Sequence, residues 1–305
     1  MTGAPVARDA SNTMRFDGQV IIVTGAARGL GREHALLLGA RGATVIVNDV
    51  SQTHAERTVA DIVAAGGIAQ AVVGSVAEPD QAAALVNDTV AHHGRLDALL
   101  NNAGNGGPTG PIDTIGDDIL HKIVDSHLLG SFHTARAAWP IMVASGGGRI
   151  VFTSSGSSMG AAGMPVYSMA KAGLWGLTRA LAVEGAEHNI RVNAILPMGY
   201  TRAASLNPNE DTRHWMEHNF PPHLCAPTAA LMCHPDVPCT GELISTGGGR
   251  VARIATVGVP GLDAGAELTL ELLRDHWDEV VSMDRHQVLM MGRDELSFYQ
   301  GPAAF

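Results

Sequence analysis

The sequence predicts an α/β fold, a doubly wound parallel sheet of about seven strands with helices on both faces. Short apolar runs rich in β-branched residues alternate with longer stretches of helical character, which is the pattern of repeated βαβ units. The runs are apolar throughout, as expected for strands that are buried on both faces. Glycine contributes 36 of the 305 residues and 46% of the chain is hydrophobic, which suits helices packed closely on a sheet.

Seven apolar runs are expected to form the strands. They span residues 19–24, 44–49, 68–74, 96–101, 148–155, 190–197 and 241–245. Helical segments separate them, so consecutive strands need parallel crossovers. Residues 264–283 are again helical in character, and a tail follows to Phe305. We therefore expect an N-terminal tail over 1–15, a single domain over 16–261 with an insertion at about 202–224, and a C-terminal helical extension over 262–305.

The charge and the terminal segment limit the classes of partner. The formal net charge of −10 argues against nucleic acid or an anionic membrane surface as a partner. Residues 1–15 carry charges and lack an apolar core, so they do not resemble a signal peptide. No segment approaches the roughly 20 apolar residues of a membrane span. We expect a soluble, cytoplasmic protein that acts on a small molecule.

The cysteines do not predict a metal site. Three cysteines in a chain without a secretion signal indicate reduced thiols. Their spacings, even with two nearby histidines, match no paired metal-ligand motif, so no metal is expected. The residues considered are Cys225, Cys233, Cys239, His223 and His234.

The first predicted strand runs directly into a glycine-rich turn and then a helix. Glycines at 25, 29 and 31 allow a tight turn and a close backbone approach to a pyrophosphate, which a helix N-terminus then stabilises. Their spacing differs by one residue from the common dinucleotide fingerprint. A Rossmann-type nucleotide site is therefore expected here. Its predicted cofactor-binding residues are Gly25, Arg28, Gly29, Leu30 and Gly31.

The second predicted strand ends in Asp49, eighteen residues after Gly31. A carboxylate there can accept hydrogen bonds from the adenosine ribose hydroxyls and would repel a 2′-phosphate, which favours NAD over NADP. Arg28 favours the opposite choice, because a cation in the glycine turn could meet a 2′-phosphate. The position of Asp49 at a strand end gives it the greater weight. The alternative is that Asp49 is only a turn residue or helix cap before Ser51.

A tyrosine and a lysine lie four positions apart at the start of an apolar helix, as Tyr167 and Lys171. Residues with this spacing share one helix face. The fixed ammonium would favour the phenolate and lower the tyrosine pKa from about 10, giving an acid-base group near neutral pH. The preceding strand ends in Ser154 and Ser155, either of which could hold a carbonyl or alcohol oxygen. The alternative is a surface tyrosine beside a solvated lysine.

These motifs, with the turn Asn-Asn-Ala-Gly at 101–104, resemble the short-chain dehydrogenase/reductase family from about residue 16 to about residue 249. The resemblance implies that Tyr167 is the catalytic acid-base group, that Lys171 orients the nicotinamide ribose and that a serine binds the reacting oxygen. It also implies that the turn closes over the adenosine ribose. The cofactor-binding residues of that turn are then Asn102, Ala103 and Gly104.

The choice between the two serines depends on how the resemblance is aligned. The family usually places its serine thirteen residues before the tyrosine, which gives Ser154. Alignment of the strand at 148–155 gives Ser155 instead, twelve residues before Tyr167. The strand is rigid, whereas the following loop can lose a residue more easily. We therefore expect Ser155 to be catalytic, with Ser154 as the alternative; adjacent strand residues point to opposite faces, so only one can face the substrate.

Two further positions depart from the family pattern. His127 stands where the family has a catalytic asparagine; it can hold a water in a proton relay behind the lysine, and its charge would then matter near neutral pH. The alternative is a histidine packed in a helix interface. Ser75 and Val76 stand where many relatives carry aspartate and valine, and Ser75 can also accept a hydrogen bond from the adenine amino group.

The segment after the sixth strand resembles the family's proline-glycine segment that touches the nicotinamide amide. It supplies Pro197, Gly199 and Thr201 as cofactor-binding residues. The insertion at about 202–224 corresponds to a mobile lid over the substrate. Its apolar lining is expected to be Trp215, Met216 and Phe220. The alternative is an apolar face that packs on the core.

Several segments narrow the resemblance to the dehydrogenase part of the peroxisomal multifunctional β-oxidation enzymes. They are residues 47–49, 127–132 and 180–185 and the C-terminal extension. This implies an NAD-dependent oxidoreductase that interconverts a secondary alcohol and a ketone, with a (3R)-hydroxyacyl-CoA as substrate, in a homotetramer whose tail reaches a neighbouring subunit. One alternative is the same chemistry on a cyclic terpenoid or sterol alcohol. The other is a non-catalytic NAD-binding regulatory protein.

Overall fold

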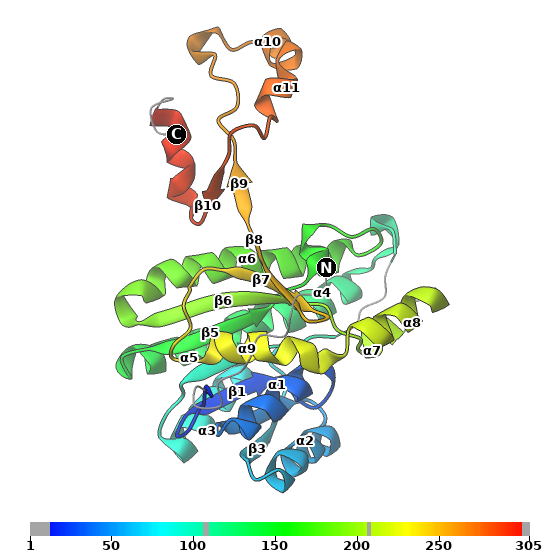
Figure 1. Ribbon diagram of the computed structural model, residues 1–305, viewed down its shortest axis with the longest axis vertical. Helices are drawn as coiled ribbons and strands as arrows, with labels where there is room; N and C mark the ends of the chain where they lie inside the picture. The colour runs from blue at the N-terminus through cyan, green and yellow to red at the C-terminus, as the bar shows by residue number, and fades with distance from the viewer. Residues whose placement is uncertain (1–12, 106–109, 206–208, 301–305) are drawn as a thin grey trace.

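A computed structural model describes residues 13–105, 110–205 and 209–300, and its centre is an eight-stranded sheet. The strand order is β3-β2-β1-β4-β5-β6-β7-β8, and the first seven strands are all parallel to their neighbours. Figure 1 shows helices on both sides of it. The predicted fold class is therefore confirmed. The strands are β1 (Val20–Thr24), β2 (Thr44–Asp49), β3 (Ile68–Val73), β4 (Ala98–Asn101), β5 (Gly148–Thr153), β6 (Ile190–Pro197), β7 (Leu243–Gly247) and β8 (Arg250–Ile254).

Alternate residues of the buried strands feed two apolar cores, one on each face of the sheet. On β1, Ile21 and Val23 belong to the core shared with α1 (Gly29–Ala40), α2 (Gln52–Ala64) and α9 (Ala226–Cys233). Ile22 belongs to the opposite core, shared with three other helices. Those are α3 (Pro79–His93), α5 (Gly130–Ala144) and α6 (Pro165–Glu184). The residues of β1, β4 and β5 are all buried, and β2 is buried except at its two ends, which explains why the sequences of these strands are largely apolar.

Three smaller segments connect these elements near the carboxyl ends of the strands. Helix α4 (Asp117–Val124) continues through a π-helical turn (Asp125–Leu129) into α5. The predicted insertion contains α7 (Arg202–Ser205) and α8 (Glu210–Asn219), and residues 206–208 lie outside the described residues. Short 3₁₀ turns occur at 112–114, 156–159, 185–188 and 222–225.

Strand β8 is an addition that the sequence prediction missed. It pairs antiparallel with β7 through a turn at Gly248 and Gly249, and both glycines have positive φ, 57° and 80°. Two consecutive positive φ values suit a tight two-residue hairpin, where glycine carries no steric penalty. The hairpin was not foreseen because the apolar run that marks β7 ends before it, and β8 itself carries exposed arginines.

The extension beyond β8 is only partly helical. Figure 1 shows it projecting away from the sheet as a separate arm; we call residues 256–300 the C-terminal arm. Two short strands, β9 (Thr256–Gly258) and β10 (Gln287–Leu289), pair antiparallel in it. The helical stretch expected over 264–283 is broken into short pieces. These are a 3₁₀ turn at 265–267, α10 (Leu270–Asp275) and α11 (Trp277–Val280), and another 3₁₀ segment spans Gly292–Gln300. Residues 301–305 lie outside the described residues.

Polar contacts fix the base of the arm, and apolar side chains cover much of its surface. Arg179 on α6 donates to Thr256 Oγ1 at 3.1 Å, and Arg253 on β8 donates to Met290 Sδ at 3.0 Å. Large exposed apolar residues are concentrated farther along the arm. They are Leu268, Leu270, Trp277, Val281, Met283, Val288, Leu296 and Tyr299. Within the described ranges no helix is long and apolar enough to cross a membrane.

Candidate active site

The predicted site residues gather where the parallel strands end. In the observed order, β1 lies between β2 and β4, so the chain winds outward in opposite directions on either side of β1. Such a switch point opens a crevice at the carboxyl ends of the strands, where open α/β sheets bind ligands. The glycine turn follows β1, Asp49 ends β2, the Asn-Asn-Ala-Gly turn follows β4, and Ser155 follows β5.

The glycine turn is packed so closely that a side chain at Gly25 or Gly31 would clash. Gly25 and Gly29 have positive φ values of 62° and 56°. A Cβ added at Gly31 would lie 2.3 Å from the Gly25 carbonyl oxygen and 2.4 Å from Asn102 Nδ2. No side chain within the described residues caps the start of α1, and Arg28 at its N-cap is exposed. The first amides of α1 therefore face the crevice without a side-chain cap, as a phosphate-binding helix requires.

Hydrogen bonds tie the Asn-Asn-Ala-Gly turn to the glycine turn. Asn102 Nδ2 donates to the carbonyl oxygens of Thr24 and Gly25, each at 3.1 Å. Thr24 Oγ1 accepts from the backbone N–H groups of Asn102 and Ala103, each at 3.0 Å. Thr24 was not among the predicted site residues, although its position as the last polar residue of a buried strand was a signal for such a role.

Asp49 is held at the mouth of the glycine turn. Its Oδ2 accepts from the backbone N–H of Ala27 at 3.2 Å, and its Oδ1 accepts from that of Ser51 at 3.0 Å. The first contact places the carboxylate beside the glycine turn. The second is the turn-capping contact that was weighed as the alternative, so the side chain makes both.

The two residues after β3 occupy different environments. Val76 is buried, and a Cβ added at Gly130 would lie 2.8 Å from its Cγ2. Ser75 is half-buried, and its backbone N–H donates to Gln81 Oε1 at 2.8 Å. Val76 thus fixes the segment by packing, whereas the Ser75 side chain stays closer to the surface.

Lys171 is almost completely buried beside Tyr167. Its Nζ donates to the Thr153 carbonyl oxygen at 2.5 Å and lies 5.7 Å from the centre of the tyrosine ring. Burial lowers the pKa of Lys171 to about 7, because the charged form loses its water. Thr153 was not predicted, and nothing in its strand sequence distinguishes it from other threonines.

The pKa of Tyr167 moves in the direction opposite to the sequence-based expectation. Burial raises the pKa of its phenol, and a hydrogen bond with Ser155 opposes that rise. The expectation assumed that the charge of Lys171 would dominate. In the structure Lys171 is itself desolvated and bonded to Thr153 O, so the loss of water around the phenol has the larger effect.

The structure separates the roles of the two adjacent serines. Ser154 is buried; its Oγ donates to the Lys171 carbonyl oxygen at 2.8 Å and accepts from Trp175 Nε1 at 3.0 Å. Ser155 is half-buried, and its Oγ accepts from the Ser157 N–H at 3.2 Å. Only Ser155 has a hydrogen bond with Tyr167 among the described contacts. The Ser154 hydroxyl thus both donates and accepts inside the fold, whereas Ser155 is the serine that contacts Tyr167.

His127 lies in the π-helical turn, buried against Tyr167 with the two ring centres 5.2 Å apart and nearly perpendicular. Its Nε2 contacts the backbone of Asn105, 3.1 Å from N and 2.8 Å from O. Burial, with the nearby charge of Lys171, lowers the pKa of His127 to about 3. The ring is therefore neutral near neutral pH, and the expected sensitivity to its charge there is not supported.

The segment after β6 folds back over the glycine turn. A Cβ added at Gly199 would lie 3.0 Å from Leu30, and one at Gly29 would lie 3.6 Å from Thr201. Pro197 is the last residue of β6. Of the predicted lid residues, Trp215 and Phe220 contact each other edge-on, with their ring centres 4.9 Å apart. Trp215 is 55% exposed. Most of the Trp215 side chain therefore does not pack on the core.

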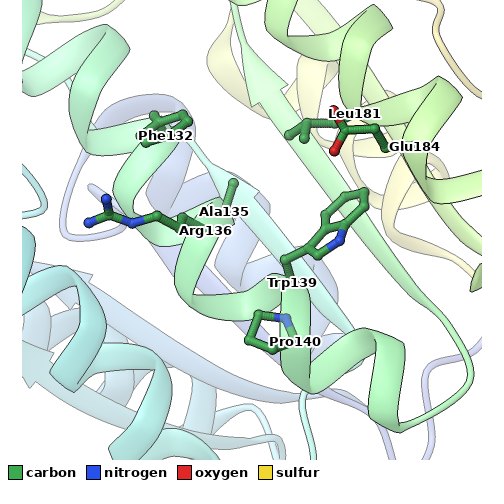
Figure 2. A pocket seen from close by; sticks show the side chains of 7 residues that line it. All are labelled: Phe132, Ala135, Arg136, Trp139, Pro140, Leu181 and Glu184. Atoms are coloured by element: carbon green, nitrogen blue, oxygen red, sulfur yellow. The ribbon is translucent and has the colours of Figure 1, made fainter.

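Figure 2 shows an apolar hollow that is lined by other residues. It has a volume of about 250 Å³ and lies between α5 and α6. Phe132, Trp139 and Leu181 contribute apolar surface, with Arg136 and Glu184 at its border. None of the predicted site residues lines it. Within the described residues, no group of three or more histidines, cysteines or acids is placed to hold a metal ion.

Comparison with known proteins gives a consistent result. The family model described as short chain dehydrogenase matches residues 19–214. The peroxisomal multifunctional enzyme type 2 of Drosophila melanogaster is 36% identical over 286 residues, covering 89% of this chain and 46% of that protein. The corresponding enzyme of Mus musculus is 35% identical over 285 residues, 88% of this chain and 37% of that protein. The chain thus spans less than half the length of these curated relatives.

Solved structures agree with the sequence comparison. The full-length Drosophila enzyme superposes with a TM-score of 0.77 at 32% identity, covering 94% of this chain and 49% of that one. A short chain dehydrogenase from Mycobacterium avium gives a TM-score of 0.77 at 32% identity, covering 87% of this chain and 96% of that one. A 7α-hydroxysteroid dehydrogenase complexed with NADH and 7-oxo glycochenodeoxycholic acid gives a TM-score of 0.73 at 29% identity, covering 79% of this chain and 98% of that one.

Proposed function

This chain belongs to the short chain dehydrogenase family and is an oxidoreductase, and from that premise we propose that it interconverts a secondary alcohol and a ketone with NAD as the hydride carrier. The observation that carries the proposal is the meeting of Ser155, Tyr167 and Lys171 at the carboxyl edge of the sheet. A hydroxyl bonded to a phenol, with a buried lysine amine beside the phenol ring, supplies what proton transfer at a carbonyl oxygen requires.

The crevice fits a dinucleotide in the shape of its backbone. A side chain at Gly25 or Gly31 would clash, no side chain of the described residues caps the start of α1, and Asp49 is fixed beside them. The amides of Gly29 to Gly31 would hold the pyrophosphate, and Asp49 would bind the adenosine ribose hydroxyls. The carboxylate supports NAD over NADP because it would repel a 2′-phosphate. When bound, the nicotinamide accepts or returns the hydride.

The protein residues then have separate tasks. Ser155 holds the reacting oxygen with its hydroxyl, which the Ser157 N–H orients from the other side. In ketone reduction Tyr167 donates its phenolic proton to that oxygen, and its raised pKa keeps the proton available. In alcohol oxidation Tyr167 must first lose the proton, and Lys171 beside the ring stabilises the phenolate when Lys171 is charged.

We propose a (3R)-hydroxyacyl-CoA as the substrate class. Support comes from the similarity to the multifunctional enzymes, which includes the C-terminal arm and not only the shared sheet. The second candidate is a cyclic secondary alcohol, because the 7α-hydroxysteroid dehydrogenase superposes over 79% of this chain.

The test is NADH formation by the purified protein, followed by absorbance, with NAD or NADP. A medium-chain (3R)-hydroxyacyl-CoA is offered beside its (3S) isomer and a panel of cyclic secondary alcohols. Saturable turnover of the (3R) thioester with NAD would support the proposal, and turnover of cyclic alcohols alone would support the second candidate. NAD binding without turnover on any substrate would favour a regulatory protein.

We also propose a homotetramer. Two surfaces support self-association, the apolar hollow between α5 and α6 (Figure 2) and the exposed apolar residues of the C-terminal arm. Exposed apolar surface of this kind marks association sites. Light scattering gives the mass in solution, and a monomeric mass at micromolar concentration would exclude the proposal. A cytoplasmic location stays a prediction, since the names of several relatives place those proteins in peroxisomes.

A further inference from the structure

We infer that His127 is a positioning residue, a wedge that holds the 102–105 turn in place against Tyr167, and that its imidazole leaves no room for a side chain at position 104. The inference rests on the proposed function, because the turn and Tyr167 are the groups that we assign to the cofactor and the substrate. It replaces the proton-relay role that the sequence suggested for His127 with a role in geometry.

The ring of His127 is fixed from several sides. Nε2 contacts both backbone atoms of Asn105, and the ring edge packs against Tyr167. The backbone behind the ring is fixed as well, because Ser131 Oγ donates to the His127 carbonyl oxygen at 2.8 Å. The π-helical turn at 125–129 aims the side chain at this position, and such turns inside helices often occur at functional sites.

Asn105 completes the connection from the other side. Its side-chain Nδ2 donates to Ser126 Oγ at 2.8 Å and to the Lys122 carbonyl oxygen at 3.1 Å. Both its backbone and its side chain are therefore bonded to the segment that carries His127. Because Asn102 is bonded to the glycine turn, the whole turn is attached at both of its ends.

Gly104 lies directly under the imidazole. A Cβ added there would lie 2.2 Å from His127 Cε1 and 2.5 Å from Nδ1. The φ of Gly104 is not among the positive values, so the backbone conformation itself admits alanine. The ring cannot move aside without losing its hydrogen bond to Asn105 or its contact with Tyr167. In this protein the neighbouring ring therefore leaves no room for a side chain at 104.

The same contacts argue against a relay. A relay member must exchange protons with water or with Lys171, yet Nε2 is occupied by the backbone of Asn105 and Nδ1 is buried without a hydrogen-bond partner among the described residues. The low pKa of the ring agrees with this, because burial and the charge of Lys171 disfavour its protonated form. A neutral ring held in this way acts through its shape and its bond to Asn105.

The first test is a double-mutant cycle with Gly104→Ala and His127→Ala. Thermal unfolding of the cofactor-free protein and the NADH dissociation constant, from fluorescence, are both measured. We expect G104A to lower the melting temperature and to weaken NADH binding by about tenfold or more. Overpacking by an added methyl group changes an equilibrium constant by roughly a factor of ten. Adding H127A should restore much of both losses, because it removes the clashing ring. Additive losses would overturn the inference.

Gly292→Ala serves as the matched control. A Cβ there meets no atom within 4 Å and its φ is ordinary, so neither measurement should change. If G104A alone fails to fold, recovery of a folded protein in the double variant shows the coupling, and a double variant that also fails to fold contradicts it. The unfolding arm needs no cofactor, so it tests the wedge even if the wild-type protein binds no NADH, which would count against the proposed function instead.

The second test separates the wedge from a relay. In His127→Gln the amide can reach the position of Nε2 and bond to Asn105 but cannot be protonated. We expect its turnover to have the wild-type pH profile, with any loss seen in KM or in NADH affinity. A changed pH profile of kcat with unchanged NADH affinity would show that His127 moves protons and would overturn the inference.

Discussion

The two adjacent serines give a sharp test of the active-site geometry, because substitution of each by alanine should affect a different property. Ser154→Ala removes a buried hydroxyl that donates to Lys171 O and accepts from Trp175 Nε1. The indole N–H loses its partner, and an unsatisfied buried group costs about 1–3 kcal/mol. For a domain of this size each kcal/mol lowers the melting temperature by about 2–4 °C. Ser154→Ala should therefore melt earlier yet turn over substrate at nearly the wild-type rate.

Ser155→Ala should show the reverse. The side chain is half-buried, and its loss leaves the Ser157 N–H without that acceptor and the Tyr167 phenol without its hydrogen bond to Ser155. Water in the open crevice can replace both partners at little cost. The hydroxyl that holds the reacting oxygen disappears, however, and removal of one such donor typically costs about 10²–10³-fold in kcat. The melting temperature should stay close to that of the wild-type protein.

The assay measures both properties on the same preparations. Thermal unfolding gives the melting temperatures, and NADH formation with the best substrate gives kcat and KM. Circular dichroism at the assay temperature shows that each variant is folded. A folded Ser154→Ala protein with kcat reduced a hundredfold, beside a Ser155→Ala protein of normal activity, would refute the assignment and restore the thirteen-residue spacing of the family.

Three other predictions follow from the site and the core. Tyr167→Phe should lower turnover by about 10²–10⁴-fold, and because the pKa of Tyr167 is raised, wild-type alcohol oxidation should speed up as pH rises from neutral into the alkaline range; a flat profile of kcat would contradict the tyrosine as base. Asp49→Ala should weaken NAD binding by about 10–100-fold, the value of hydrogen bonds to a charged group, and NADP binding far less; an unchanged NAD to NADP ratio of kcat/KM would mean that another group reads the ribose. Burial lowers the pKa of His34 to about 3, and both of its ring nitrogens are buried without a partner among the described residues. Its folded-state pKa lies below the unfolded value near 6.5, so the protein should keep its stability above that pH and lose it on acidification toward pH 3, by up to about 1.4 kcal/mol per pH unit. In urea titrations His34→Leu should flatten this dependence, and an equal slope in both proteins would contradict it.

The sequence predicted the sheet because the strand signal is local. Runs such as 20–24 and 44–49 are buried on both faces, so their apolar character shows without knowledge of the neighbours. Strand β8 was missed because it is a half-exposed strand whose pairing depends on the Gly248–Gly249 turn. The arm was predicted as helical because residues 264–283 have helical composition, but Thr269 caps one short helix and the chain turns again at His276. Tertiary context, not propensity, sets those ends.

Part of the candidate site could also be predicted, because its signal is local in the sequence. Tyr167 and Lys171 are four residues apart, so one helix brings them together whatever surrounds it. The choice of Ser155 depended on treating the strand as rigid, and its contact with Tyr167 supports that choice. The raised pKa of the phenol was not predictable, because it depends on how much water the whole fold removes. The contact of His127 with Asn105 likewise joins residues twenty-two positions apart through an irregular turn.

The two edges of the sheet differ in how they resist aggregation. At one edge, β8 carries the exposed charges of Arg250 and Arg253, and charged edge strands discourage pairing with another chain. At the other edge, β3 has no charged residue. Its first and last residues, Ile68 and Val73, are 63% and 50% exposed. In concentrated solution β3 is therefore the vulnerable edge. A single lysine substitution in β3 would be the simplest change to reduce aggregation when this protein is stored or crystallised.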